Sequence, residues 1–391
     1  MLFAGFSTFS LLYSVQPLLP LFARDFRVSA EEASLAVSLA TGPLAVAILF
    51  AGVLSDRVGR RGMMVWAMYA AGVLTVLTAV APGWGTLLAA RLLTGLALAG
   101  VPAVAMAYVS EEVDSRSVGP AMGLYIAGSA IGGMAGRLGV SLVTELADWR
   151  WALAVDGVAG LVLAEAFRRL APPSARFASQ RTTIAGLARS ATGLFRDPAL
   201  PLLYAEAFLL MGVFVTLYNY AGFRLGAPPF SLGHAAIGAI FLLYLLGSVS
   251  SAWFGGLAER RGRRLVFWIP AMLLLLGVAL TAGMSLVVVI AGIGVATIGF
   301  FGAHSIASSW VGRRARANRG QAAAFYLFFY YLGSSVLGSA GGVAWSRFGW
   351  NGVVGFCGGL MLVALVLAGL LGRVAPLPLG AGTPPRPLGA D

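Results

Sequence analysis

The sequence has few charged residues and no lysine. Only 11% of the 391 residues are charged and 59% are hydrophobic, whereas ordinary soluble domains have about 25% and roughly 45–50%. A chain with this balance has too few polar side chains to cover a folded surface in water. The composition therefore excludes a soluble globular protein and indicates an integral membrane protein.

The sequence also has little of what metal and redox sites need. A single cysteine, Cys357, excludes an internal disulfide and any zinc cluster, and we expect it to be a small buried side chain. No cluster of histidine, cysteine or carboxylate has the spacing of a metal site or a catalytic triad, and there is no GxxxxGK[ST] phosphate-binding loop. We expect no metal, no cofactor, no enzymatic activity and no ATP drive within this chain.

Long hydrophobic runs dominate the sequence instead. An apolar stretch of at least about 18 residues can cross the hydrocarbon layer as a helix. We predict an all-α integral membrane protein with twelve transmembrane helices in two pseudo-symmetric six-helix bundles. The predicted spans are 2–22, 33–54, 63–82, 85–108, 119–142, 150–168, 199–223, 234–257, 265–283, 286–309, 321–344 and 350–371.

All 27 positive side chains are arginines, and they are distributed unevenly between the ends of the spans. If both termini are cytoplasmic, 20 arginines lie in inner loops and tails, five in outer loops and two within helices. This distribution satisfies the positive-inside rule. Topology and attraction to anionic lipid headgroups explain the net charge of +12, which does not indicate a nucleic-acid partner.

Two similar turns lie between apolar segments. GVLSDRVGRR occupies residues 52–61 and GGLAERRGRR occupies residues 255–264, 203 positions later. Likewise, GPAMGLYIAGSAIGG from residue 119 aligns with GQAAAFYLFFYYLGSS from residue 320, at an offset of 201. A nearly constant offset predicts duplication of a six-helix unit.

The predicted duplication divides the chain into four parts. They are an N-terminal bundle at 1–168, a basic cytoplasmic linker at 169–198, a C-terminal bundle at 199–372 and a tail at 373–391. Apolar residues at helical spacing within 182–195 predict an amphipathic interfacial helix in the linker. The tail is rich in proline and glycine, which predicts disorder.

The first turn resembles the loop signature G-x-L-[AS]-D-R-x-G-R-[RK] of the major facilitator superfamily, and it fits every position. The segments GLYIAGSAIGGMAGR and LLYAEAFLLMGVFVTLYNYAGFRL resemble the YnfM-type branch of bacterial inner-membrane exporters. The resemblance implies two bundles that rock about a central cavity, lined mainly by helices one, four, seven and ten.

The charged residues of the two turns predict a cytoplasmic gate. We expect Asp56 to face the positive N-terminal end of a neighbouring helix, and the arginines to pair with Glu111 or Glu112. This cluster would hold the bundles together in one conformation; alternatively, the arginines only fix topology. The predicted gate residues are Gly52, Asp56, Arg57, Gly59, Arg60, Arg61, Glu111, Glu112, Glu259, Arg260, Arg263 and Arg264.

Small residues recur every four positions in two of the predicted helices, where they favour close helix packing or a hinge. The glycine-proline pair of the family's exporter signature is missing from the first of them. The predicted packing residues are Gly128, Gly132 and Gly136 in the fifth helix, and Ser334, Gly338 and Gly342 in the eleventh.

Polar residues inside the spans are costly, at about 2.5–3.5 kcal/mol for each charge at mid-membrane, so they mark a site. Counting ~1.5 Å per residue, Gln16, Arg91, Arg137 and Asp156 fall at one depth and predict a polar layer. We expect Asp156 to pair with Arg137. Arg91, which resembles the family's R-x-x-x-G arginine, would remain a free cation that favours an anionic or carbonyl-bearing substrate. Alternatively, both arginines reach the membrane interface.

Two further polar residues, Glu206 and His304, lie at similar depths in the second half. A carboxylate and an imidazole in a wet cavity titrate in the physiological range, so we interpret Glu206 as a proton site assisted by His304, with Arg91 and Asp156 as further candidates for proton coupling. A structural hydrogen bond between helices is the alternative. The other predicted cavity residues are Tyr13, Tyr218, Asn219, Tyr244, Tyr326 and Tyr330.

These features predict a monomeric secondary active transporter in the bacterial inner membrane, with both termini cytoplasmic. It would exchange a small organic molecule for protons by alternating access, in the direction of efflux. Proton-coupled uptake or facilitated diffusion of a small anionic or polar solute is the alternative. A non-transporting membrane receptor is an alternative from a different class.

Overall fold

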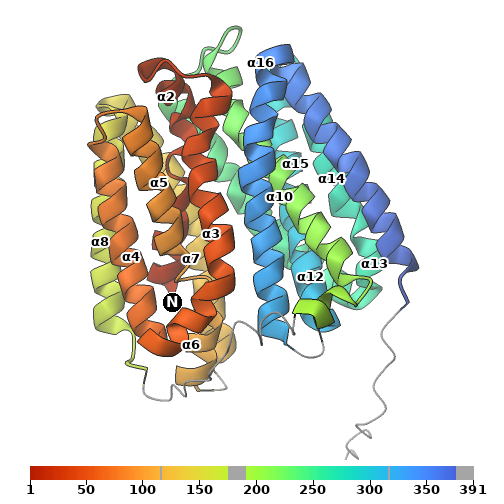
Figure 1. Ribbon diagram of the computed structural model, residues 1–391. Coiled ribbons are helices and arrows are strands. Elements are labelled where there is room, and N and C mark those ends of the chain that lie inside the picture. The colour runs from red at the N-terminus through yellow and green to blue at the C-terminus, as the bar shows by residue number, and fades with distance from the viewer. Residues whose placement is uncertain (115–116, 175–190, 316–317, 376–391) are drawn as a thin grey trace, which may run out of the picture.

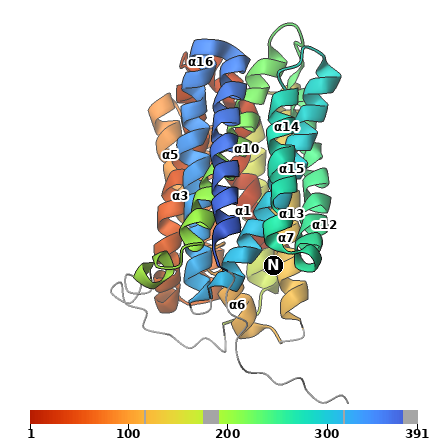
Figure 2. The same cartoon turned by 90° about the vertical axis from the view of Figure 1, so that its right-hand side faces the viewer.

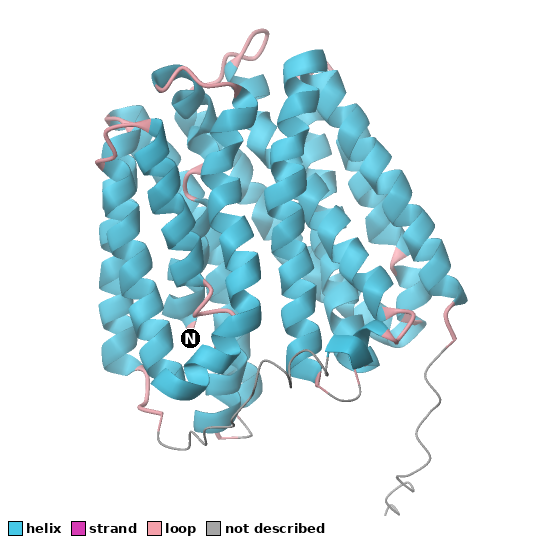
Figure 3. Cartoon of the chain, in the orientation of Figure 1, coloured by secondary structure: helices cyan, strands magenta, loops and turns pink. Residues whose placement is uncertain are grey.

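The computed structural model describes residues 1–114, 117–174, 191–315 and 318–375 (Figure 1). Every regular element in these ranges is a helix (Figure 3), and nine helical segments among them are long and apolar enough to cross a membrane. The predicted all-α membrane architecture is confirmed. Most of the linker helix expected at 182–195, and the tail from residue 376, lie outside the described residues.

The helices follow the predicted spans closely. Those of the first half are α1 (Leu2–Tyr13), η1 (Gln16–Leu18), α2 (Leu19–Asp25), α3 (Ala30–Val58), α4 (Arg60–Ala79), α5 (Trp84–Leu98), α6 (Ala105–Glu112), α7 (Val118–Leu146) and α8 (Trp149–Leu170). Those of the second half are α10 (Leu200–Gly226), α11 (His234–Ala239), η2 (Ile240–Leu243), α12 (Tyr244–Arg261), α13 (Arg263–Val266), α14 (Trp268–Leu280), α15 (Leu286–Arg314) and α16 (Arg319–Arg373).

The nine membrane-capable segments of the described chain differ from the twelve predicted spans at three places. Predicted span 85–108 is divided into α5 and α6, and predicted span 150–168 coincides with α8, which carries charged residues near both ends. The last two predicted spans both lie in α16. Within α16, Gly349 has non-helical dihedral angles, with φ 60° and ψ −146°, and separates two helical parts.

The two halves of the chain form two groups of helices that lie side by side (Figure 1) and run along a common direction (Figure 2). Helices up to α8 pack mainly on one another, as do the helices from α10 onward. The groups meet where α3 packs on α16, where α7 packs on α11, and where η1 packs on α10. This boundary is where a site shared by both halves can form.

The two repeated turns lie at the same end of the molecule, which we call the arginine-rich end because it holds the arginines of residues 57–61 and 260–264 (Figure 1). Gly59 has φ 86° and ψ 144°, and Gly262, 203 positions later, has φ 93° and ψ 135°. Residues with a side chain rarely adopt this conformation. Both turns therefore depend on glycine, as repeated units would.

Glycines also set the distance between α1 and α7. A Cβ atom on Gly132 would lie 2.2 Å from the carbonyl oxygen of Phe6, so only glycine permits this approach, and Gly128 and Gly136 meet α1 in the same way. In the second half the equivalent contact is made by Gly333, where a Cβ would lie 2.1 Å from the carbonyl oxygen of Phe208.

The predicted small-residue series of α16 therefore lies beside the residue that makes the tight contact with α10. Ser334 approaches Tyr13 of α1, with 3.4 Å between their hydroxyl oxygens, and a Cβ on Gly342 would meet Glu31 of α3 at 2.5 Å. Gly338 faces Val215 of α10. Two of the three predicted residues thus pack the second half against the first.

Candidate functional site

A cavity of about 340 Å³ lies between the two halves of the chain. The first half contributes α1, with Tyr13, and α7, with Arg137; the second half contributes residues of α10, α12, α15 and α16, including His304 and Tyr330. No described residue of α5 or α6, the expected fourth helix, lines it. The expectation of a lining by helices one, four, seven and ten is wrong at this point, because α7 takes the place of the fourth helix.

The cavity is open toward the arginine-rich end. Ile126, which lies in the part of α7 nearest that end, lines the cavity and is 63% exposed, whereas Tyr13 at the other end of the cavity is 2% exposed. Arg137 and Tyr244 are buried beside Tyr13. The polar and aromatic groups therefore lie at the buried end of the cavity, away from the arginine-rich end.

Hydrogen bonds join the two halves beyond this buried end. The Nε2 of Gln16 donates to the Oδ1 of Asn219 at 2.7 Å, and the hydroxyls of Ser38 and Ser339 lie 2.6 Å apart. Toward the end opposite the arginine-rich end, the backbone N–H of Ala235 donates to a carboxylate oxygen of Glu145 at 3.1 Å. These contacts close the molecule on the side away from the cavity entrance.

Arg137 is the cation of the cavity. Its Nε donates to the Oε1 of Gln16 at 2.7 Å, its Nη1 donates to the carbonyl oxygen of Gly133, and its guanidinium carbon lies 4.5 Å from the centre of the Tyr13 ring. The predicted ion pair with Asp156 is wrong. Arg137 points to the cavity side of α1, where it has no carboxylate partner among the described residues.

Arg91 lies within the first half and stabilises the end of α1. Its Nε donates to the carbonyl oxygen of Ala36 at 3.0 Å, Nη1 to that of Leu11 at 3.0 Å and Nη2 to that of Leu12 at 2.5 Å. Carbonyls in the last turn of a helix lack intrahelical donors, and here Pro17 prevents the helix from continuing. Arg91 is fully buried and does not line the cavity, so the prediction that it is a free cavity cation is wrong.

Asp156 is also turned toward α1. One carboxylate oxygen accepts a hydrogen bond from the hydroxyl of Ser10 at 2.7 Å, and the other has no partner among the described residues. The predicted single polar layer is therefore divided by α1. Gln16 and Arg137 lie on the cavity side, and Arg91 and Asp156 bind α1 from inside the first half.

The proton-site candidates of the second half lie beside the cavity. His304 lines it, and the Nδ1 of His304 lies within hydrogen-bond distance of the Tyr326 hydroxyl at 3.0 Å. Tyr326 also interacts electrostatically with Glu206. Glu206 is fully buried, and neither of its carboxyl oxygens has a hydrogen-bond partner in the described part of the chain. Tyr326 is thus near both the carboxyl group and the imidazole, but of these two groups it is hydrogen bonded only to the imidazole.

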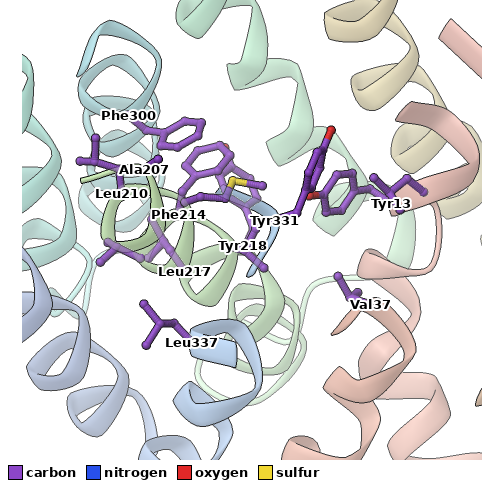
Figure 4. Close-up of a cluster of buried hydrophobic side chains, with 14 of the residues drawn as sticks. Tyr13, Val37, Ala207, Leu210, Phe214, Leu217, Tyr218, Phe300, Tyr331 and Leu337 are labelled. Carbon is purple, nitrogen blue, oxygen red and sulfur yellow. The ribbon is translucent and has the colours of Figure 1, made fainter. Parts of the chain in front are cut away.

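Aromatic rings form much of the remaining wall. Phe214 and Phe300 are stacked with ring centres 3.9 Å apart and planes inclined by 8° (Figure 4). Tyr218, one turn beyond Phe214, shares a hydrogen bond with Thr297 at 2.8 Å. In Figure 4 the side chain of Tyr13 approaches that of Tyr331 of α16 across the boundary between the halves, and Tyr331 is not one of the predicted residues. The predicted tyrosines thus lie in or directly behind the wall.

The sequence analysis missed the phenylalanines and serines of the wall. Their signal was spacing: Phe301, His304, Ser305 and Ser308 lie at positions i, i+3, i+4 and i+7 of α15 and line the cavity together. This face has no net apolar character, so a search for hydrophobic periodicity does not find it. The spacing of these residues from His304 is the sequence signal that identifies this face of α15.

The predicted gate cluster forms, but within one half. Arg60 binds Asp56 at 2.8 Å and Glu111 at 3.2 Å, and all three belong to α3, α4 and α6. Arg61 donates from Nε to the carbonyl oxygen of Ala171 at 2.9 Å, after the end of α8, and Arg57 is exposed. These ion pairs do not join the two halves of the chain in this conformation, which agrees with a cavity that extends toward the same end.

The second copy of the turn has a longer and more exposed ion pair than the first copy. Glu259 and Arg263 are 3.5 Å apart, and the Glu259 side chain is 68% exposed. Glu111, which binds Arg60 of the first copy, has Arg314 at the position 203 residues later, and Arg314 instead pairs with Asp197 at 2.7 Å. This pair, which the sequence analysis missed, fastens the end of α15 to the start of α10.

A multi-spanning helical chain whose two halves enclose a one-sided cavity with a polar, aromatic end has the construction of a membrane transporter. The described residues contain no group of three or more potential metal ligands. The model of the Major Facilitator Superfamily matches residues 1–338, and the chain belongs to this superfamily.

Relatives and solved structures agree with this assignment. The chain is 44% identical over 375 residues to the MFS-type transporter YybF of Bacillus subtilis, which covers 96% of this chain and 93% of that one. It is 43% identical over 375 residues to the inner membrane transport protein YnfM of Escherichia coli, covering 95% and 89%. Its fold is similar to an inward-facing, occupied bacterial homologue of the human lysosomal transporter Spinster, with TM-score 0.76, 15% identity and 96% coverage of both chains.

The protein is therefore a multi-pass membrane transporter with a small-molecule substrate, and not an enzyme. The alternative of a non-transporting receptor is not favoured, because both relatives are named as transporters.

Proposed function

We propose that this transporter exports a small organic molecule from the bacterial cytoplasm in exchange for protons. Glu206 carries the proposal, because it is a fully buried carboxyl group without a hydrogen-bond partner in the described part of the chain, on the helix α10 that also lines the cavity through Met211 and Phe214. An ionised carboxylate in such surroundings would be costly. In this conformation we therefore expect Glu206 to hold a proton, and Tyr326, which binds His304 of the cavity wall, is the group through which the proton would reach the cavity.

The orientation of the protein follows from its arginines. The positive-inside rule assigns the arginine-rich end, and with it both termini, to the cytoplasm. The cavity then opens to the cytoplasm, and the relative YnfM is named as an inner membrane protein. A substrate entering from the cytoplasm meets a transporter that has brought a proton inward on Glu206, as exchange of substrate for proton requires.

Twelve spans in two bundles of six fit the helices. The 55 residues of α16 would make a straight helix about 80 Å long at ~1.5 Å per residue, more than twice the ~30 Å hydrocarbon layer, so it crosses twice with a break at Gly349. The shorter α5 and α6 cross together, and α8 completes the first bundle. The bundles then comprise residues 1–168 and 199–372.

Proton-coupled uptake or facilitated diffusion is the second candidate. It is favoured by the absence of an acid from α1 and η1, where the neutral Gln16 binds the cavity residue Arg137. The two candidate functions differ in the direction in which a proton gradient drives the substrate. In export by exchange the substrate moves opposite to the protons, and in proton-coupled uptake it moves with them.

The test uses the full-length protein in lipid vesicles. A ligand is first found by thermal shift, and its flux is then measured with and without a pH gradient. We expect a pH gradient to drive the wild type, and Glu206→Gln to exchange substrate but ignore the gradient. Glu165→Gln is the matched control, because Glu165 pairs with Arg168 at 2.6 Å on α8 outside the cavity lining. A Glu206→Gln variant that the gradient still drives would refute the assignment.

A further inference from the structure

The cavity wall carries one permanent charge. Among the described residues that line the cavity, Arg137 is the single arginine, and none is aspartate or glutamate. His304 of α15 also lines the cavity, where its ring lies against those of Phe300 and Tyr330. The buried end of the cavity is thus positive, and no acidic side chain of the described wall neutralises it.

The surroundings of Arg137 leave its charge uncompensated. Arg137 is 3% exposed, and its hydrogen bonds go to neutral acceptors, the side chain of Gln16 and the carbonyl of Gly133. Its guanidinium also lies 5.1 Å and 5.2 Å from the ring centres of Phe241 and Tyr244. Aromatic faces attract a cation, but they do not replace a counter-ion when the cation is buried. Binding an anion here would relieve that cost.

Arg137 has a donor available for a ligand. Its Nε and Nη1 are used by Gln16 and Gly133, and no hydrogen bond within the described part of the chain uses Nη2. A single guanidinium group matches one carboxylate well. A phosphate dianion would need further positive groups, and the described lining offers only His304, beyond the aromatic wall.

The rest of the wall selects the body of the ligand. Phe214 and Phe300 form a flat stacked pair, and Tyr244 and Phe301 stand edge-on to one another beside it. Rings prefer offset or edge-to-face contact with other rings. The volume of about 340 Å³ is at the small end of the roughly 300–1,000 Å³ of ligand pockets. The wall therefore fits a small, flat, apolar body.

We propose that Arg137 determines substrate specificity by binding the carboxylate of a small aromatic monocarboxylate, whose ring packs against Phe214 and Phe300. The inference rests on the proposed function only in taking this cavity as the substrate site. It assigns to Arg137 the role that the sequence suggested for Arg91.

The test measures equilibrium binding to the purified full-length protein, without any gradient. The probes are benzoate, phenylacetate and 3-phenylpropionate, each compared with its neutral amide, together with 2-phenylethylamine and phenylphosphonate. We expect at least one carboxylate to bind tenfold or more tightly than its amide, and the amine and the phosphonate to bind more weakly than that carboxylate. Equal binding of acid and amide, a preference for the amine or the phosphonate, or no binding of any carboxylate would overturn the proposal.

Three variants connect the preference to Arg137. Arg137→Gln should abolish the difference between acid and amide, and Arg137→Lys should keep part of it, which a purely structural role would not produce. Arg224→Gln is the matched control, because Arg224 also stacks on a ring, that of Trp350 at 4.9 Å, and donates to a carbonyl, but lies outside the cavity lining. Retention of the acid preference in Arg137→Gln would contradict the assignment.

This outcome is separable from that of the proposed function. Carboxylate binding without an effect of protons on flux would refute proton coupling and leave the role of Arg137 intact. Proton-driven flux of amines or amides, without binding of carboxylates, would refute the role of Arg137 and leave proton coupling intact.

Discussion

Gln16 and Asn219 bind each other across the two halves at 2.7 Å, and they are 203 positions apart, which is the offset between Gly59 and Gly262. The two residues therefore lie at, or within one position of, equivalent places in the repeat, since the equivalent contacts of Phe6 and Phe208 are 202 positions apart. Both are buried, and the Oε1 of Gln16 also accepts from Arg137. One amide pair thus connects the cavity cation to the boundary that closes the molecule.

The first prediction concerns this pair. Gln16→Leu leaves Asn219 and Arg137 without their buried partner, so we expect a loss of about 1–3 kcal/mol in stability. The double variant Gln16→Leu with Asn219→Leu should lose less than the sum of the single variants, because both partners are then removed. Thermal unfolding of the four proteins in the same lipid or detergent measures this difference. Strict additivity would show that the bond contributes nothing.

A second prediction separates Arg91 from Arg137. Arg91→Gln removes donors from the carbonyls of Leu11 and Leu12 at the end of α1, each worth about 1–3 kcal/mol when left unsatisfied, and one from the carbonyl of Ala36 within α3. We expect it to lower the melting temperature more than Arg137→Gln does, and to keep the preference for carboxylates in any protein that remains folded. Melting curves and binding isotherms of both variants test this. A loss of selectivity in stable Arg91→Gln would contradict it.

The third prediction concerns the approach of α1 to α7. Gly132→Ala places a Cβ against the carbonyl oxygen of Phe6, and we expect about 1–3 kcal/mol of destabilisation, as for other overpacked sites. Gly333→Ala should behave alike, because it meets Phe208 in the same way. Gly139→Ala on α7 is the control, since nothing lies within 4 Å of the added atom. Unfolding measurements that rank Gly139→Ala with the other two would refute the packing argument.

A fourth prediction concerns the ion pairs of the first turn. Arg60 binds both Asp56 and Glu111, so Arg60→Gln should cost more stability than Asp56→Asn or Glu111→Gln alone. Exposed Arg57 in the same turn is the matched control, and Arg57→Gln should change stability by less than about 0.5 kcal/mol. Thermal unfolding at low and high salt tests this ranking. Equal effects of Arg57→Gln and Arg60→Gln would refute it.

The sequence was a good guide to what depends on length and order along the chain. Apolar runs located the membrane helices, and the echo of residues 52–61 at 255–264 located two turns with the same backbone conformation. Both properties are local, since a helix must be long enough to cross a bilayer and a glycine must adopt a positive φ where the chain reverses.

The candidate site was harder to predict, because the depth of a residue along its helix does not tell which side of the helix that residue faces. Gln16 and Arg137 were correctly expected to lie near each other, but Asp156 was not their neighbour, because it binds Ser10 on another side of α1. The partner of Arg91 was hidden for another reason: it is a set of backbone carbonyls, freed where α1 ends, and no side-chain pattern reveals them.

The pairing of Gln16 with Asn219 also bears on how such a chain arises. A carboxamide both donates and accepts, so two identical amides satisfy each other across a two-fold axis. Two separate half-length chains can therefore form this contact in a symmetric dimer. The pair of Arg60 and Glu111 has no counterpart in the second half, because the residue 203 positions after Glu111 is Arg314 and not an acid. The amide pair is compatible with an ancestor of two identical subunits, a symmetry that the pair of Arg60 and Glu111 does not share.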